Sequence, residues 1–273
     1  MKKFILTSIL VFSSPLLFAS NEPFSGSARA LGLGNATLTF SDAYSVLNNQ
    51  AAMAFRKNIS FSLFAEQRYF QNELGYYAAG LTLPTKKGAF GLSINYNGFD
   101  LYNEQKIGLG YAMLFSKNIS GSLQIDYLST SIAEYGTSSA FTFEAGLLVK
   151  INDQLKGAAH VFNPVAVKSG FAVEKVPTVF QLGLSYEPGK KVLLSAEVEK
   201  DIDNAARFKA GVEYKIVDVL HLRGGIETNP SQYGLGVGIN VKQLKIDIAA
   251  SYHQVLGVTP AFSLNYVFEK KKK

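Results

Sequence analysis

From residue 57 onward, the sequence alternates between apolar and polar side chains in one segment after another. In the stretch QLKIDIAASYHQV, one face of an extended chain carries Leu244, Ile246, Ile248, Ala250 and Tyr252. The opposite face carries Lys245, Asp247, Ala249, Ser251 and His253. A period of two residues is typical of a β-strand, whereas a helix repeats roughly every 3.6 residues. The pattern therefore predicts an all-β fold.

Fourteen such segments follow one another, and they predict fourteen antiparallel strands. Their expected bounds are 57–67, 75–84, 88–97, 105–115, 119–129, 139–151, 155–162, 177–187, 191–200, 206–216, 219–228, 232–242, 244–253 and 260–269. Several are about ten residues long, the length that a tilted strand needs to cross a bilayer. No window approaches about 18 uninterrupted apolar residues after the N-terminus, so we expect no spanning helix.

The connections between these segments differ in length by parity. After even-numbered strands they are short: PTKKG, SKN, NDQ, EPGKK, Val217-Asp218 and Gln243. After odd-numbered strands they are mostly longer: NGFDLYNEQ, STSIAEYGTSS, NPVAVKSGFAVEKVP, KDIDNAAR and HQVLGVTPA. Short periplasmic turns and longer outer loops are typical of an outer-membrane barrel. An even strand number then places both termini on the periplasmic side.

A closed barrel in lipid inverts the usual arrangement, because its apolar face meets acyl chains and its polar face meets water. A soluble β-sandwich would alternate too, but fourteen meandering strands favour the membrane barrel. Aromatic residues near strand ends suit interfacial girdles: Tyr69, Tyr77, Phe99, Tyr127, Tyr186, Tyr214, Tyr252 and Phe268. The charges expected in the lumen are Arg68, Asp126, Glu144, Glu197, Lys209, Glu213, Arg223, Glu227, Lys245 and Asp247.

Composition and the termini complete this division of the chain. The 273 residues include no cysteine and carry a net charge of +6 that is spread over turns and Lys270–Lys273. Disulfides and thiol chemistry are thereby excluded, and a nucleic-acid partner is not expected. Residues 1–19 read as a signal peptide, with Lys2 and Lys3 before an apolar run. We expect a plug at 20–56, a barrel at 57–269 and a basic tail at 270–273.

The segment at 20–56 lacks the alternation of the strands, and fourteen strands enclose a lumen that their own side chains cannot fill. We expect the segment to plug it. Residues Ala28–Gly34 fit a helical turn, and Ser41-Asp42 could cap a second one through Ala43–Leu47. The glycines expected to face inward either leave room for a plug or ligand to approach the wall or ease the curvature of the barrel. They are Gly108, Gly110, Gly234, Gly236 and Gly238.

The run SARALGLGNATLTFSDAYSVLNNQAAMA resembles the N-terminal plug of the FadL/TodX hydrocarbon-transporter superfamily, and more closely that of its PorV/PorQ relatives in type IX secretion. The matching positions are Ala28, Ala30, Leu31, Gly32, Gly34, Ser41, Asp42, Asn49 and Ala51. Gln50 departs from the pattern, since it stands where the family has proline. The plug motif residues of interest are Arg29, Gly32, Gly34, Asp42 and Asn49.

Arg29 is the only basic residue of this run. One hypothesis is that it pairs with a lumen carboxylate such as Glu144, Glu197 or Glu213; the other is that it faces water. The three histidines, His160, His221 and His253, lie on different strands without ligand spacing, and Gly32-Leu33-Gly34 is no dinucleotide fingerprint. We expect neither an enzyme nor a cofactor.

Three functions remain open. The resemblance implies a non-enzymatic accessory of protein secretion or surface attachment, with secretion-system or other outer-membrane subunits as partners. It also implies a FadL-like passive channel for small hydrophobic molecules. A structural partner subunit without transport is the third. Outer-membrane lipid is a partner in each. The longest connection, Asn163–Pro177, is a candidate outer docking loop through Val165, Phe171 and Val173.

Overall fold

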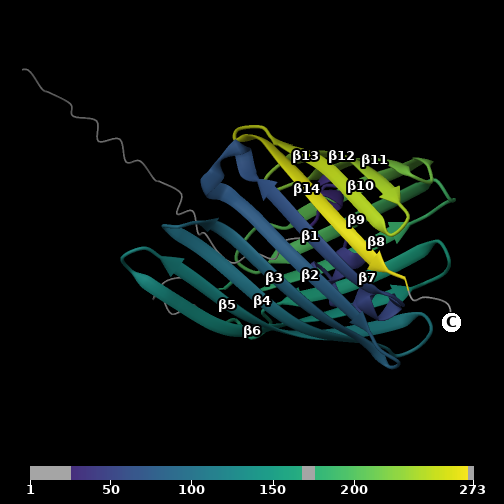
Figure 1. The fold of residues 1–273 in the computed structure, drawn as a ribbon, viewed down its shortest axis with the longest axis horizontal. Coiled ribbons are helices and arrows are strands. Elements are labelled where there is room, and N and C mark those ends of the chain that lie inside the picture. Colours follow the sequence, from purple (N-terminus) through teal and green to yellow (C-terminus); the bar gives the residue numbers. More distant parts are fainter. Residues whose placement is uncertain (1–25, 168–175, 270–273) are drawn as a thin grey trace, which may run out of the picture.

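Fourteen antiparallel strands form a closed barrel in a computed structural model that describes residues 26–167 and 176–269 (Figure 1). Each strand pairs with its neighbours along the chain, and β1 pairs with β14 to close the ring, with Ile59 opposite Phe268. The strands are β1 (Ile59–Gln67), β2 (Gly75–Pro84), β3 (Gly88–Phe99), β4 (Tyr102–Leu114), β5 (Ile119–Ile132), β6 (Gly136–Lys150), β7 (Leu155–Phe162), β8 (Val179–Tyr186), β9 (Val192–Asp201), β10 (Arg207–Val217), β11 (Leu220–Glu227), β12 (Gln232–Val241), β13 (Leu244–His253) and β14 (Gly257–Phe268).

The barrel is inverted, as the alternation predicts. On β13, Ile248 and Tyr252 are 58% and 49% exposed, whereas Asp247 and Ser251 are 2% and 5% exposed. The same holds around the ring, where Leu123, Leu182 and Leu235 point outward while carboxylates are buried inside. A wall of apolar side chains around a polar interior belongs in lipid, because in water it would leave its hydrophobic surface exposed. The fold is a transmembrane β-barrel.

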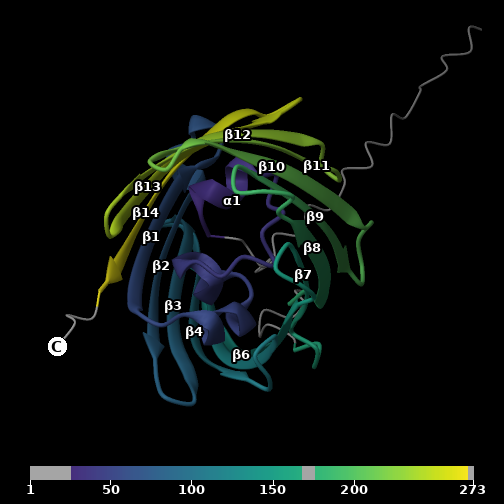
Figure 2. The ribbon, with the colours of Figure 1, turned by 90° about the vertical axis from the view of Figure 1, so that its right-hand side faces the viewer.

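The segment before β1 lies inside the ring of strands, as Figure 2 shows from the rim at which β14 ends. It contains α1 (Ala28–Gly32) and two 3₁₀ helices, η1 (Ala43–Leu47) and η2 (Gln50–Phe55). Ser27 caps α1, Asp42 caps η1 and Asn49 caps η2 through their side-chain oxygens. The expected helix at Ala43–Leu47 is confirmed; η2 was not expected. We refer to the described residues of this segment, 26–56, as the plug.

The plug crosses the lumen from one wall to the other. The helix α1 contacts β11, β12, β13 and β14, η1 contacts β1 and β2, and η2 contacts β3, β4, β5 and β6. Nearly every side chain of the plug is buried, including Leu33, Val46 and Met53. The barrel therefore has its core in the bore, where the first described residues of the chain meet its last strands.

The expected contrast between short turns and long loops is largely wrong. The strands extend beyond their expected bounds, so that β3 and β4 are joined by residues 100–101, β5 and β6 by 133–135, and β13 and β14 by 254–256. Near the rim that carries these three connections, both faces of a strand can meet water, so the alternation fades before the strand ends. Two longer connections remain. One is 68–74, with the short 3₁₀ helices η3 (Arg68–Phe70) and η4 (Asn72–Leu74), and the other is 163–178. We call the opposite rim, with its consistently short connections, the short-turn rim.

Parts of the expected organisation lie outside the described residues. These are the signal peptide at 1–19, the first residues of the plug segment, the basic tail at 270–273, and Phe171 and Val173 of the candidate docking loop. Within the described ranges, no helix is both long and apolar enough to span a bilayer.

Candidate functional site: the plug and the charged lumen wall

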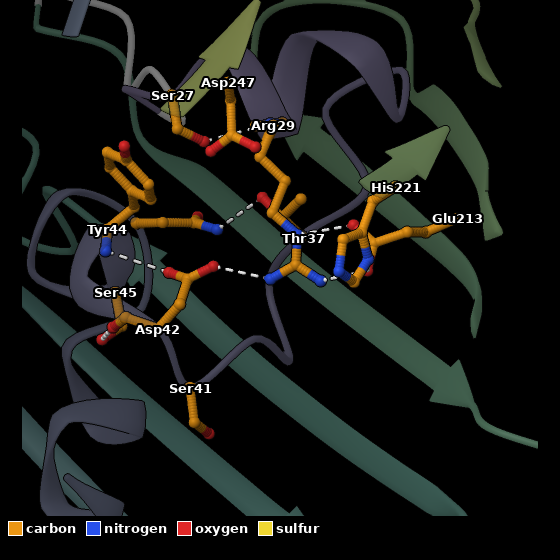
Figure 3. Close-up of polar contacts among 12 residues, drawn as sticks. Ser27, Arg29, Thr37, Ser41, Asp42, Tyr44, Ser45, Glu213, His221 and Asp247 are labelled. Carbon is orange, nitrogen blue, oxygen red and sulfur yellow. Dashed lines mark hydrogen bonds and ion pairs between the residues drawn. The ribbon is translucent and has the colours of Figure 1, made fainter. Parts of the chain in front are cut away.

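Arg29 is the centre of the contact between plug and wall. Its Nε and Nη2 donate to the two carboxylate oxygens of Glu213 at 2.9 and 2.8 Å, and its Nη1 donates to Asp42 at 2.8 Å (Figure 3). The ring of Phe40 lies 4.4 Å from the guanidinium. Burial disfavours the charge of Arg29, but Glu213 and Asp42 outweigh it and hold the pKa of the guanidinium above its ordinary value. Of the three carboxylates that the sequence suggested for Arg29, the partner is Glu213.

Glu213 continues into a chain of charges along β10, β11 and β13. Arg223 donates to Glu213 and to Asp247, both at 2.6 Å. His221 lies 3.6 Å from Glu213 on its Nδ1 side and 2.8 Å from the amide of Asn240 on its Nε2 side. Because acid and base alternate, each buried charge has an opposite neighbour, as buried charges require. One carboxylate, Glu213, thus joins the plug arginine to a wall arginine.

A second cluster lies across β4, β6 and β7, with Glu144 at its centre. Lys106 donates to Glu144 at 2.7 Å, Gln50 of the plug donates to it at 2.8 Å, and His160 lies 3.0 Å from it. The other ring nitrogen of His160 lies 3.0 Å from Gln181. Gln50, the residue that departs from the family pattern, is therefore a hydrogen-bond donor to a buried carboxylate of the wall.

From Gln181 the network continues onto β9 and β10. Gln181 donates to Glu199 at 2.9 Å, and Lys209 bridges Glu197 and Glu199 at 3.1 and 2.7 Å. Two plug contacts end here or nearby: the backbone NH of Leu38 donates to Glu197 at 3.2 Å, and Asn35 donates to Glu227 at 2.8 Å. The plug is thus held by carboxylates on four strands, β6, β9, β10 and β11.

The glycines of the wall make room for the plug on one side of the lumen. A Cβ at Gly234 would lie 2.1 Å from the backbone oxygen of Leu31, and one at Gly225 would lie 2.1 Å from the backbone carbon of Leu33. At Gly236 it would lie 3.3 Å from the Cα of Gly32. Of the two explanations for inward glycines, room for the plug holds at Gly234 and Gly236.

Three other inward glycines make room for wall side chains. A Cβ at Gly238 would meet the guanidinium of Arg223 at 2.4 Å, and one at Gly108 would meet Gln124 and Ser93 at 2.5 Å. A Cβ at Gly110 would lie 3.0 Å from Gln124. These positions keep the polar side chains of the wall close together beneath the plug.

The plug motif residues have distinct places in this arrangement. Gly34 adopts a φ of +60°, and a Cβ there would lie 2.4 Å from the backbone oxygen of Ile226. Asn49 caps η2 and also donates to the backbone oxygens of Leu38 at 3.1 Å and Leu147 at 3.3 Å. The helix α1 and its Gly34 turn therefore fit against strand backbone, a contact that side chains larger than glycine would prevent.

The enclosed space beside Arg29 is small and polar. A cavity of about 50 Å³ is lined by residues that include Tyr44, Lys245 and Asn265. A water molecule takes about 30 Å³ of liquid volume, so this space suits one or two waters. The lumen is filled at the level of Arg29 by the plug.

Sequence reasoning found most of the wall charges but missed several partners. Lys106 has the same strand parity as the inward glycines Gly108 and Gly110, so this signal could have identified it. Arg68, by contrast, does not line a strand, because it lies in η3 at the rim, where it pairs with Glu66. His253 also lies at the rim, where its Nδ1 accepts from the backbone of the β13–β14 turn.

Asn163, a buried residue at the start of the connection between β7 and β8, also binds the end of that connection. Thr142 donates to the side chain of Asn163, which donates in turn to the backbone oxygen of Val176 at 2.8 Å, and Thr178 donates to the backbone oxygen of Asn163. In the sequence, the Asn163-Pro164 step was the only signal of this anchor. In the structure, Asn163 has a φ of +51°. Val165, the one docking-loop candidate within the described residues, is 51% exposed.

Comparison with known proteins supports the fold. No protein-family model matches the chain, and no curated protein matches it in sequence. Among solved structures, the toluene transporter TbuX of Ralstonia pickettii has a TM-score of 0.72 at 12% identity, over 89% of this chain and 98% of that one. The CymD monoaromatic hydrocarbon channel and the P. putida toluene transporter TodX both have TM-scores of 0.68, at 12% and 11% identity, over 92% of this chain and all of theirs. The chain therefore shares the barrel fold of these proteins.

The titratable residues offer no metal site in the described ranges, since no group of three or more His, Asp and Glu side chains there is arranged to hold an ion. The carboxylates of the lumen are instead bound to cations and amides. The plug and the wall are therefore joined by hydrogen bonds to carboxylates, with the Arg29–Glu213 ion pair among them.

Proposed function

We propose that this chain is an outer-membrane channel of the FadL/TodX type, a non-enzymatic passage for small, mostly hydrophobic molecules, in which the plug is a movable stopper. The observation that carries the proposal is the shared fold, which extends over 89–92% of the chain for a monoaromatic hydrocarbon channel and two toluene transporters. Resemblance of the plug sequence to that superfamily agrees with it.

The contacts between plug and wall suit a stopper that can leave its seat. Arg29, Asn35 and Gln50 each bind a wall carboxylate through their side chains. When such a contact opens, water can replace the lost hydrogen bond, so its net contribution is about 1.5–3 kcal/mol, the range for hydrogen bonds to charged groups. An apolar interface of the same size would lose its whole burial energy on opening. The seat thus combines these polar contacts, which water can replace, with the buried apolar contacts of Leu33, Val46 and Met53, which are lost on opening.

We place the protein in the bacterial outer membrane, with lipid around its apolar wall and the short-turn rim on the periplasmic side. Strand β1 begins and β14 ends at that rim, where Ile59 pairs with Phe268. The two longer connections, 68–74 and 163–178, lie at the opposite rim, and longer loops face outward in such barrels. The start of β1 and the end of β14 then both lie on the periplasmic side. Labelling of a cysteine introduced at Lys117, in the β4–β5 turn, by a membrane-impermeant maleimide should occur only after the outer membrane is permeabilised.

A cross-link between plug and wall tests whether the stopper must move. The chain has no cysteine of its own, and a Cβ at Gly183 would lie 3.0 Å from the Cβ of Leu38, near the separation of about 3.5–4.5 Å found in disulfides. In the double variant Leu38→Cys/Gly183→Cys, uptake of toluene should stop when the disulfide forms and return on reduction.

The two single-cysteine variants are the controls, since they carry each change without the bond. Uptake by the oxidised double variant at the rate of these controls would contradict a movable stopper. Absence of uptake above that of cells without the protein, in every variant and in the wild type, would contradict a channel altogether.

A second candidate is the PorV/PorQ-like accessory of protein secretion or surface attachment, with secretion-system subunits as partners. The exposed Val165, at the start of the connection anchored by Asn163 and Thr178, favours it, because an apolar side chain on an anchored connection suits docking. Deletion of the gene should then trap exported cargo in the periplasm, and the barrel should co-purify with secretion components. A partner subunit without transport would co-purify but would leave both cargo and uptake unchanged.

A further inference from the structure

A basic vestibule lies between the plug and the short-turn rim. This hollow has a volume of about 320 Å³ and is open on one side. Its lining comes from the plug and from the strand ends and turns of β7 to β11 and β13: Arg29, Phe40, Ser41, Asp42, Arg56, Lys156, Glu187, Gly189, Lys190, Lys191, Val192, Leu193, Glu213, Lys215, His221 and Lys245. Ligand pockets commonly have volumes of about 300–1,000 Å³, so the vestibule is large enough for a small solute.

Charge in the vestibule is unbalanced. Seven of its lining residues are cationic and three are acidic. The three carboxylates are already bound: Asp42 and Glu213 pair with Arg29, and Glu187 pairs with Lys156 at 2.7 Å. Among the described residues, Arg56, Lys190, Lys191 and Lys245 have no ion-pair partner. An excess of cations in a partly closed space raises the local concentration of anions.

Two of these cations, Arg56 and Lys245, are partly buried and lie near enough to repel each other. Lys245 is half-buried on β13, where the positive charges of Arg29 and Arg56 act on it and the negative charges of Asp42 and Asp247 partly offset them. Arg56, at the end of the plug, uses one Nη to donate to the backbone oxygen of Ser41, while its Nε is buried without a partner. Burial lowers the pKa of Arg56, with Asp42 as the one carboxylate that offsets it. Like charges that are only partly compensated are unfavourable.

Ser41 adds a neutral donor at the same place. Its Oγ is buried without a hydrogen-bond partner and lines the vestibule, as do Arg56 and Lys245. A buried hydroxyl and a buried guanidinium NH without partners each cost free energy that a bound acceptor would recover. A negatively charged group with several acceptor oxygens would suit both donors.

We propose that the vestibule binds a small solute with a phosphate or carboxylate group, held by Arg56 and Lys245 with Ser41 as a hydrogen-bond donor. Lys190 and Lys191, exposed in the β8–β9 turn, attract the anion from the solvent. The vestibule lies on the lumen side of the strands, so the ligand is a dissolved molecule and not the headgroup of a lipid around the barrel. The site does not require the plug to move, and it goes beyond the proposed transport function.

Binding would also connect two parts of the chain, because Arg56 and Ser41 belong to the plug whereas Lys245 belongs to the wall. A bound oxyanion replaces repulsion between these parts by two charge-assisted contacts. The ligand should therefore stabilise the seated plug, and saturating phosphate should raise the unfolding temperature of the wild type more than an equal ionic strength of chloride does.

Isothermal titration calorimetry on the full chain in detergent, at fixed ionic strength, tests the proposal. Inorganic phosphate and succinate are titrated separately, because they distinguish a phosphate ligand from a carboxylate one. We expect saturable binding of at least one probe with one site per chain. Lys245→Gln should weaken it about tenfold or more, since a charge-assisted hydrogen bond is lost, whereas Lys245→Arg should largely retain it.

Lys117→Gln is the matched control, because Lys117 is an exposed lysine of the same rim outside the vestibule. It should leave the affinity unchanged. Heat-modifiable migration on gels checks that each variant has folded. Binding of neither probe to the wild type, or an equal loss of affinity in Lys117→Gln and Lys245→Gln, would overturn the proposal, because the first shows no site and the second shows only general charge attraction.

Discussion

The two halves of the plug meet the wall of the barrel in different ways. The first half, Ser27–Asn35, presses its own backbone against glycines of β10, β11 and β12, so that a Cβ at Gly211 or Gly225 would meet backbone atoms of Leu33 at 2.5 and 2.1 Å. The second half, residues 46–53, meets the wall through side-chain ends: a Cβ at Gly91 would meet the Sδ of Met53 at 2.5 Å. The first contact is fixed by shape, whereas the second can adapt.

This difference suggests how the plug would move. Side chains change rotamer at small cost, but a backbone in contact with another backbone has no such freedom. The first half also carries the double contact of Arg29 with Glu213. We therefore expect the second half to loosen first and the first half to hold the plug in its seat.

The largest expected effect comes from the same substitution made on the two sides. Gly225→Ala places a methyl group into the backbone of Leu33 and should displace the first half of the plug, at a cost of about 2–4 kcal/mol. Gly91→Ala meets side-chain atoms only, the Sδ of Met53 and the Cγ2 of Val46, and should cost less, about 1–2 kcal/mol. Unfolding temperature and single-channel conductance in planar bilayers measure both. Equal effects would remove the distinction between the halves.

Gly34→Ala should have an effect of similar size, also in the first half of the plug. A left-handed φ of +60° costs an alanine about 1–2 kcal/mol, and the new methyl group would also approach the backbone of Ile226. Limited proteolysis should cut the plug faster than in the wild type. Gly189→Ala is the control, since nothing lies within 4 Å of a Cβ there; a plug as protected in Gly34→Ala as in Gly189→Ala would contradict the close fit.

Arg29→Ala removes the ionic contact of the first half without changing its backbone fit. Asp42 loses its ion-pair partner, while Glu213 keeps Arg223, so we expect a loss of about 1–3 kcal/mol. Single-channel conductance should rise because the plug is held less firmly. Arg29→Lys should lie in between, since an ammonium cannot reproduce the forked contact. An unchanged conductance trace in Arg29→Ala would show that Arg29 does not hold the plug.

Gln50→Pro should have the smallest effect and belongs to the second half. Gln50 is the first residue of η2, a position at which proline is favourable, so the backbone should be retained. The bond to Glu144 is lost, but Lys106 and His160 still bind that carboxylate. We expect a change of about 1 kcal/mol in stability and no change in conductance. An increase in conductance as large as that of Arg29→Ala would show that the second half holds the plug as well.

The sequence predicts the face of a side chain better than its partner. Alternation on β13 predicts which residues face lipid and which face the lumen, because the backbone repeats every two residues. It cannot tell which strand lies opposite, so Arg29 had three candidate carboxylates until the curvature of the barrel placed Glu213 beside it. Which residues meet across the lumen depends on how the strands close into a barrel.

Two other features escaped sequence reasoning for physical reasons. The strands β4, β5 and β6 extend beyond their expected ends, because polar residues such as Asn103 and Ser131 are tolerated on both faces near the rim. The helix η2 contacts η1 of the plug as well as the barrel wall. Its buried residues are therefore not confined to one face, and its sequence shows no period. By contrast, Asp42 identified the start of η1 because an N-cap is a local signal.

The closure of the ring by β1 and β14 has a consequence for biogenesis. The backbone NH of Ala28 donates to Ser263, 235 positions away in the sequence, and Arg29 binds a residue 184 positions away. Synthesis therefore delivers the stopper first and the surfaces that receive it last. Contacts of such high sequence separation form late, because the intervening chain must be ordered before they can be made. The N-terminal segment can take its place in the lumen only after the last hairpin has formed.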